Sequence, residues 1–203
     1  MEKVSTLLLL HGAWPGAWSW EHLIPYLSSS HFSVLAPDLP GRNGDERCPS
    51  LQDHVAFVHG LIEKNDQPVF IVAHSFAGII ASQLAEIIPE RISGIAYIAA
   101  FLLRNGQSLF DSITDNPSEI MAALTFSGSY LDIDANAAKN CFYHQSAPEV
   151  ANWASKKLCP EAVEPMQTPL EEVDLKVLNL FFKLSTCTSI VRLELFKIRP
   201  ISS

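Results

Sequence analysis

A strand, a sharp turn and a helix follow one another without a loop in residues 68–88, and this feature most limits how the chain can fold. A short run of β-branched and aromatic side chains gives way there to an Ala-rich helical pattern that ends at Pro89. Ser75 lies at the turn, and the small residues Ala73 and Ala77 stand two positions before and after it, as a strained bend requires. The pattern predicts that Ser75 is a nucleophile with an exposed hydroxyl. The alternative is that Ser75 only caps the following helix.

A second element, the apolar strand and loop of residues 7–20, favours the nucleophile over the cap. In serine acyl transfer the developing oxyanion needs two preorganised N–H donors. One comes from the residue after the nucleophile and one from a loop that leaves a neighbouring strand. Phe76 and Ala13 stand at these two positions. The alternative for the loop is that Gly12 and Gly16 only form a turn and that its three tryptophans are core residues.

Four ordered motifs are similar to those of the α/β-hydrolase superfamily, and within it to those of small esterases of the methylesterase and hydroxynitrile lyase-like group. They are H-G-A-W-P-G-A-W-S-W at 11–20, A-P-D-L-P-G at 36–41, A-H-S-F-A-G at 73–78, and P-E-R-I at 89–92 followed by Y-I-A-A-F at 97–101. The resemblance covers roughly residues 6–172. It implies the α/β-hydrolase fold, a mostly parallel sheet flanked by helices with a cap insertion.

The same resemblance implies a function. A chain of this kind is expected to be a serine hydrolase that cleaves small apolar carboxylic esters through an acyl-enzyme on Ser75. The N–H groups of Ala13 and Phe76 would be the oxyanion donors, with no metal or organic cofactor. Hydroxynitrile lyase activity uses the same scaffold and is a further alternative, ranked below hydrolysis because the motifs do not distinguish it.

The resemblance does not supply a catalytic base. Family members complete their triad with an acid and a histidine late in the chain, whereas the last of the seven histidines here is His144. His74 is expected to point away from Ser75, His11 to fix the shape of its loop, and His144 to find another partner in the cap. A serine without an adjacent base is a poor nucleophile, so impaired activity is expected. The competing class is a catalytically inactive, truncated hydrolase-like protein that binds a ligand or a partner.

Alternating strand and helix patterns predict one domain, residues 1–203, with a parallel sheet covered by helices. The expected strands are 6–10, 33–37, 69–73 and 93–99, and the expected helices are 19–28, 51–64 and 78–88. Residues 104–165 break into short pieces punctuated by Gly and Pro, which resembles the family's cap. Seven apolar residues there are candidates for lid core or, as a lesser role, for lining a pocket: Leu109, Phe110, Met121, Leu124, Phe126, Phe142 and Trp153.

The tail of about residues 173–203 differs in charge from the rest of the chain. Residues 176–203 hold five basic side chains and one acidic one, a net charge of +4, so the total of −8 leaves −12 for residues 1–175. We interpret the tail as a truncated or out-of-register end of the family pattern, or else as a diverged end that still supplies one strand. Alternation in residues 190–198 suits an edge strand. An uncovered sheet edge would favour a homo-oligomer.

Composition argues against several other classes. The net charge of −8 and the pI near 5.3 do not suit a nucleic-acid partner, because phosphate binding calls for a basic face. The longest apolar stretch, residues 94–103, is shorter than the ~20 residues of a membrane span, and no secretory signal is recognised. The four scattered cysteines have no C-x-x-C spacing, so neither a metal site nor a disulfide framework is expected. The default expectation is a cytoplasmic protein.

Overall fold

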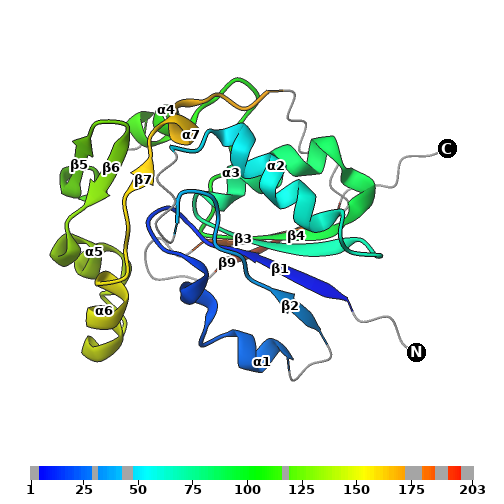
Figure 1. Ribbon diagram of the computed structural model, residues 1–203, viewed down its shortest axis with the longest axis horizontal. Coiled ribbons are helices and arrows are strands. Elements are labelled where there is room, and N and C mark those ends of the chain that lie inside the picture. Colours follow the sequence, from blue (N-terminus) through cyan, green and yellow to red (C-terminus); the bar gives the residue numbers. More distant parts are fainter. Residues whose placement is uncertain are drawn as a thin grey trace.

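A six-stranded sheet forms the centre of the molecule in the computed structural model, which describes residues 5–28, 32–42, 48–115, 119–171, 180–185 and 192–197 (Figure 1). The strand order is β2-β1-β3-β4-β8-β9, and every neighbouring pair is parallel except β8 and β9. The strands are β1 (Thr6–Leu10), β2 (Ser33–Leu35), β3 (Val69–His74), β4 (Ile92–Ile98), β8 (Leu180–Ser185) and β9 (Arg192–Lys197). The mostly parallel sheet flanked by helices that the sequence predicts is confirmed.

Helices cover both faces of the sheet because the central strands are apolar on both sides. Leu8 and Leu10 of β1 face the larger core, whereas Leu7 and Leu9 face a smaller cluster that contains Trp20. The covering helices are η1 (Ala17–Trp20), α1 (Ile24–Ser28), α2 (Leu51–Ile62), α3 (Ala77–Ile87) and η2 (Pro89–Arg91). In Figure 1, α2 and α3 lie on one side of the sheet and α1 lies on the other.

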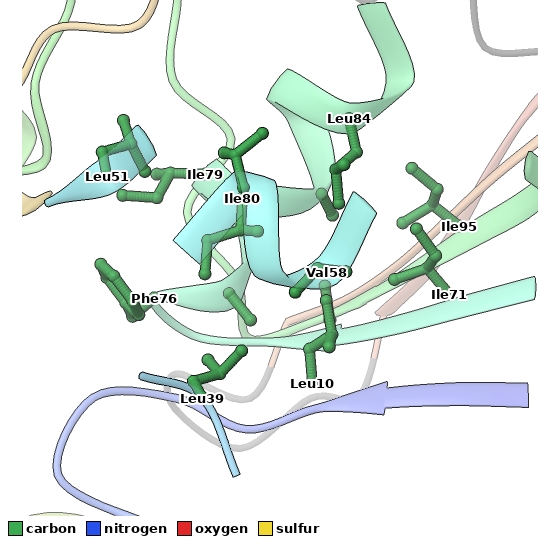
Figure 2. Packing of buried hydrophobic residues seen from close by; sticks show 14 of the residues in the cluster. Leu10, Leu39, Leu51, Val58, Ile71, Phe76, Ile79, Ile80, Leu84 and Ile95 are labelled. Carbon is green, nitrogen blue, oxygen red and sulfur yellow. The ribbon is translucent and has the colours of Figure 1, made fainter. Parts of the chain in front are cut away.

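The larger core packs α2 and α3 against β1 and β3 (Figure 2). Its members are almost fully buried aliphatic and aromatic side chains, including Leu10, Leu39, Leu51, Val58, Ile71, Phe76, Ile79, Ile80, Leu84 and Ile95. Full burial of one such side chain contributes about 1.5–3 kcal/mol. This core therefore fixes the positions of β3 and α3, which are the two elements on either side of Ser75.

The expected elements are found, with one clear error. Strands and helices begin and end within two residues of the expected positions, except in the first helix. The helix expected over 19–28 is wrong, because the chain forms the 3₁₀ turn η1 and then a separate short helix that begins at Ile24. Pro25 explains the break, since proline is tolerated in the first turn of a helix but not in its interior.

The expected cap contains a small sheet that the sequence did not reveal. Its elements are α4 (Leu109–Asp115), η3 (Glu119–Ala123), β5 (Leu124–Ser127), β6 (Tyr130–Ile133), α5 (Ala135–Phe142), α6 (Pro148–Ser155), β7 (Glu161–Ala162) and α7 (Glu164–Gln167). Strands β5, β6 and β7 form an antiparallel sheet, and Gly128 provides the positive φ of 61° in the turn between the first two. Figure 1 places this region beside the end of the central sheet at which β1 and β3 finish.

The tail supplies two strands of the central sheet. Strand β8 pairs in parallel with β4, and β9 pairs antiparallel with β8 at the sheet edge, within the range expected for an edge strand. The interpretation of the tail as an out-of-register end, and the expected homo-oligomer, remain predictions. No helix in the described part of the chain has both the length and the apolar character needed to cross a membrane.

Two helical glycines provide a matched test of this packing. A Cβ atom on Gly78 would lie 2.4 Å from the Phe101 carbonyl oxygen, whereas a Cβ on Gly60 would meet nothing within 4 Å. We expect Gly78→Ala to lower the free energy of unfolding by about 1–3 kcal/mol through overpacking. Gly60→Ala is expected to raise it by up to about 1 kcal/mol through helix propensity. Urea unfolding followed by circular dichroism measures both, and equal effects in the two variants would contradict this packing.

Candidate active site

Ser75 stands on a sharp turn between β3 and α3 in a left-handed backbone conformation, with φ 53°. Such a conformation costs a non-glycine residue about 1–3 kcal/mol and persists only where the surroundings enforce it. Strand β4 and the residues after it do so: the Ser75 N–H donates to the Ile98 carbonyl at 3.2 Å, and the Ser75 carbonyl accepts from the Phe101 N–H at 3.1 Å. The N-cap residue of α3 is Phe76, so Ser75 lies outside the helix that it was alternatively expected to cap.

The loop after β1 passes directly against this turn. A Cβ atom on Gly12 would lie 2.9 Å from the Ser75 Cβ and 2.9 Å from Nδ1 of His74, so only glycine fits there. This contact brings together the segments that carry the two expected oxyanion donors, Ala13 and Phe76. Among the described residues, neither of their N–H groups has a hydrogen-bond partner. Two unengaged amides beside a strained serine are what an oxyanion site requires, although their role remains a prediction.

His11 holds the start of this loop through both ring nitrogens. Its Nδ1–H donates to the Gly12 carbonyl at 2.9 Å, and its Nε2 accepts from the Leu39 N–H at 3.0 Å. Burial, aided by the positive charge of Arg42, lowers the pKa of His11 to about 3. The imidazole is therefore neutral and fully engaged, which fits the structural role expected for it.

Trp14, in the loop after β1, also has a strained backbone conformation, with φ 67°. All its polar groups are hydrogen-bonded to the cap. Its indole N–H donates to the Leu131 carbonyl at 2.8 Å, and its backbone carbonyl accepts from the Cys159 N–H at 3.1 Å. Its backbone N–H donates to Oε2 of Glu161 at 3.0 Å.

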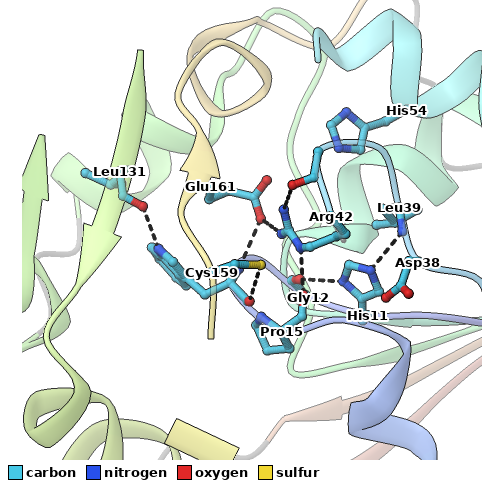
Figure 3. A network of polar contacts seen from close by, with 12 residues as sticks. His11, Gly12, Pro15, Asp38, Leu39, Arg42, His54, Leu131, Cys159 and Glu161 are labelled. Carbon is cyan, nitrogen blue, oxygen red and sulfur yellow. Dashed lines mark hydrogen bonds and ion pairs between the residues drawn. The ribbon is translucent and has the colours of Figure 1, made fainter. Parts of the chain in front are cut away.

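A buried ion pair joins this loop to the cap (Figure 3). The guanidinium of Arg42 pairs with Oε2 of Glu161 in β7, and the Arg42 Nε–H donates to the Pro15 carbonyl at 2.9 Å. The sequence analysis did not identify either residue. Arg42 directly follows the P-D-L-P-G motif, so its position next to that motif could have marked it as a candidate. Glu161 lies 119 residues away from Arg42, and no sequence motif marks it.

No described histidine is hydrogen-bonded to the Ser75 hydroxyl. His74 packs edge-on against Trp20 with ring centroids 6.3 Å apart, and burial lowers its pKa. Nδ1 of His54 bonds to the Ser50 carbonyl at 2.8 Å, and burial lowers the pKa of His54 as well. His144 is exposed, and His31 lies outside the described residues. Across the described part of the chain, no group of three or more His, Cys, Asp or Glu side chains is placed to hold a metal ion.

The apolar cap residues take different positions. Leu109 is buried in the larger core, and Phe110 and Leu124 pack against that core. Phe142 is 40% exposed and lies against Trp14, with ring centroids 6.0 Å apart. Trp153 packs edge-on against Trp18 of η1 at 5.1 Å, and Met121 and Phe126 are exposed. Phe142 of the cap therefore lies against the loop after β1.

Comparison with known proteins gives consistent results. The model of the Alpha/beta hydrolase family matches residues 7–179. The chain is 26% identical over 183 residues to a carbendazim hydrolyzing esterase of Nocardioides sp. (strain SG-4G), covering 82% of this chain and 73% of the relative. It is 33% identical over 103 residues to methylesterase 7 of Arabidopsis thaliana, covering 47% of this chain and only 39% of the relative.

A solved structure resembles the fold. An extracellular alpha/beta-hydrolase from a Paenibacillus species, described as sharing structural and functional homology with tobacco salicylic acid binding protein 2, superimposes with a TM-score of 0.76. The two are 21% identical, and the match covers 93% of this chain and 81% of the other. The chain spans less than half the length of three plant methylesterases that it matches, 49%, 41% and 39%.

The buried His11 predicts how stability depends on pH. Its pKa is about 3 in the folded chain and 6.5 as the ordinary value, so its contribution is present above pH ~6.5 and is lost as the pH falls toward ~3. Within that window we expect the free energy of unfolding to fall by up to ~1.4 kcal/mol per pH unit on account of His11. His11→Asn, which keeps one donor and one acceptor, should show a shallower fall in urea unfolding. The exposed His144→Asn should keep the wild-type slope, and an unchanged slope in His11→Asn would contradict the assignment.

Proposed function

The chain belongs to the alpha/beta hydrolase family, and from this we propose that it is a serine hydrolase that attacks small carboxylic esters through Ser75. One observation supports the proposal above all. The strained turn holds Ser75 against Gly12, beside two backbone amides that lack partners among the described residues. Strained residues of this kind cluster at active sites, where the strain is part of the mechanism.

The proposed reaction follows from this geometry. Oγ of Ser75 attacks the ester carbonyl carbon and gives up its proton, and the carbonyl oxygen becomes an oxyanion that accepts from the Ala13 and Phe76 N–H groups. The tetrahedral adduct then expels the alcohol, which takes up a proton, and leaves an acyl-enzyme that water hydrolyses. Removal of one oxyanion donor typically lowers kcat by a factor of about 10²–10³.

The proton acceptor limits the proposed rate. Because no described imidazole is hydrogen-bonded to Ser75, we infer that solvent takes its proton and that turnover is slow. Oxyanion stabilisation and binding without a working triad accelerate acyl transfer by about 10³–10⁴ over water. The rate should then rise with pH without the plateau near neutrality that a histidine base produces.

A small apolar ester is the proposed substrate class. Several relatives are named as esterases. The ring of Phe142 lies against Trp14, so it gives an apolar neighbour to residues 12–16 after β1, which we call the oxyanion loop. Because no described histidine is hydrogen-bonded to Ser75, a second candidate is a hydrolase-like protein that binds such a ligand without turnover. The two candidates differ in whether Ser75 forms a covalent adduct.

Covalent labelling separates these two candidates. A fluorophosphonate probe is expected to label the wild-type chain. Ser75→Ala is expected to lose the label completely, because no other serine in the described part of the chain stands on such a turn. The exposed cap serine in Ser146→Ala provides the matched control and should be labelled like the wild type. Folded protein that takes up no label would favour the binding protein, and label retained in Ser75→Ala would refute the assignment of the nucleophile.

Gly12→Ala tests the approach of the loop to Ser75. The added Cβ would meet the Ser75 Cβ and the His74 ring at 2.9 Å, so the loop must move away and carry the Ala13 N–H with it. A displacement of about 1 Å is expected to slow labelling roughly 10²-fold. Gly60→Ala, with open space around the new methyl group, should leave labelling unchanged. Labelling of Gly12→Ala at the wild-type rate would show that the loop takes no part.

A further inference from the structure

Residues of the cap hold Trp14 in its strained conformation. Its φ of 67° belongs to a region that bulky side chains rarely adopt. Glu161, Leu131 and Cys159 bind its backbone N–H, its indole N–H and its carbonyl in turn. Because Trp14 directly follows Ala13, whatever holds the Trp14 peptide also orients the peptide group before it.

The ion pair of Glu161 and Arg42 is hydrogen-bonded to two consecutive residues of this loop, Trp14 and Pro15 (Figure 3). Oε2 of Glu161 accepts from the Trp14 N–H at 3.0 Å while it pairs with the Arg42 guanidinium. Arg42 in turn donates from Nε to the carbonyl of Pro15 at 2.9 Å. Glu161 is fully buried and Arg42 is 7% exposed, so solvent does not compete for these contacts.

Stability alone is a poor reason for such a pair. Apolar residues of similar volume often replace a buried ion pair without loss of stability. Oε1 of Glu161 is also buried and has no hydrogen-bond partner among the described residues, which is a cost that an apolar side chain would avoid. The pair does, however, engage the Trp14 N–H, whereas the neighbouring Ala13 N–H has no hydrogen-bond partner among the described residues.

We propose that Glu161, held by Arg42, is the positioning residue of the oxyanion loop. Through the Trp14 N–H it fixes the peptide that follows Ala13 and so keeps the Ala13 N–H aimed at the oxyanion that forms when Ser75 attacks the ester carbonyl. Because Glu161 lies in β7, docking of the cap and completion of the oxyanion site become one event. This inference rests on the proposed function of Ser75.

A double variant separates positioning from stability. Glu161→Ala alone leaves the Arg42 charge buried without a partner and is expected to unfold readily, so Arg42→Met with Glu161→Leu removes both charges together. We expect this double variant to keep a urea midpoint close to that of the wild type while fluorophosphonate labelling of Ser75 slows roughly 10²-fold. Amide hydrogen exchange in residues 12–16, followed by mass spectrometry, should become roughly tenfold faster or more, and exchange in α2 should not change.

Two single variants complete the test. Glu161→Gln keeps an oxygen for the Trp14 N–H but gives up the ionic bond to Arg42, so its labelling rate should lie between those of the wild type and the double variant. If the double variant does not fold, the labelling rate of Glu161→Gln relative to the wild type tests the positioning role instead. Glu164→Ala is the matched control, because Glu164 also links the cap to the core by accepting from the Leu51 N–H at 2.8 Å. Among the described residues, no hydrogen bond joins Glu164 to residues 12–16. This control should behave like the wild type in labelling and in exchange of residues 12–16.

The outcomes are distinct. Wild-type labelling or wild-type exchange of residues 12–16 in a folded double variant would overturn the positioning role. A wild-type chain that takes up no label would instead refute the proposed function of Ser75. Hydrogen exchange would then decide by itself whether Glu161 orders the loop.

Discussion

The left-handed backbone of Ser75 is the constraint on which the rest of the site depends. Ser75 keeps its φ of 53° because β4 and the residues after it hydrogen-bond to both its N–H and its carbonyl. The bend also demands space, which Gly12 and Gly78 provide where any Cβ would collide with the serine or with the Phe101 carbonyl. The central sheet, the core beneath α3 and the loop after β1 therefore together hold Ser75 near two amides that have no hydrogen-bond partner among the described residues.

The cap does more than cover this turn. It holds the loop after β1 through hydrogen bonds to Trp14 and through the buried pair of Arg42 and Glu161. The loop is thus fixed on one side by the turn at Ser75 and on the other by β7. Under the proposed function, oxyanion stabilisation, which needs amides fixed before the reaction begins, would depend on packing between the cap and the central sheet domain.

Local features were predictable from the sequence, and long-range ones were not. The sharp turn at Ser75 was predictable because it occupies a fixed place in a strand–turn–helix motif, and the central strands were predictable from apolar runs. The roles of Ser75, Ala13 and Phe76 in catalysis remain predictions. The helix expected over 19–28 failed at Pro25, whose effect on the helix interior outweighed the periodicity. Glu161 was missed because a two-residue strand carries no periodic signal and because its partner Arg42 lies 119 residues away.

The structure of the phosphonylated protein tests the central claim most directly. After reaction with a small alkyl fluorophosphonate, the account predicts phosphorus bound to Oγ of Ser75 and the phosphonyl oxygen about 2.7–3.1 Å from the backbone nitrogens of both Ala13 and Phe76. An adduct on another residue would contradict it. So would a phosphonyl oxygen turned away from these amides, with the Ala13 and Phe76 N–H groups bonded elsewhere.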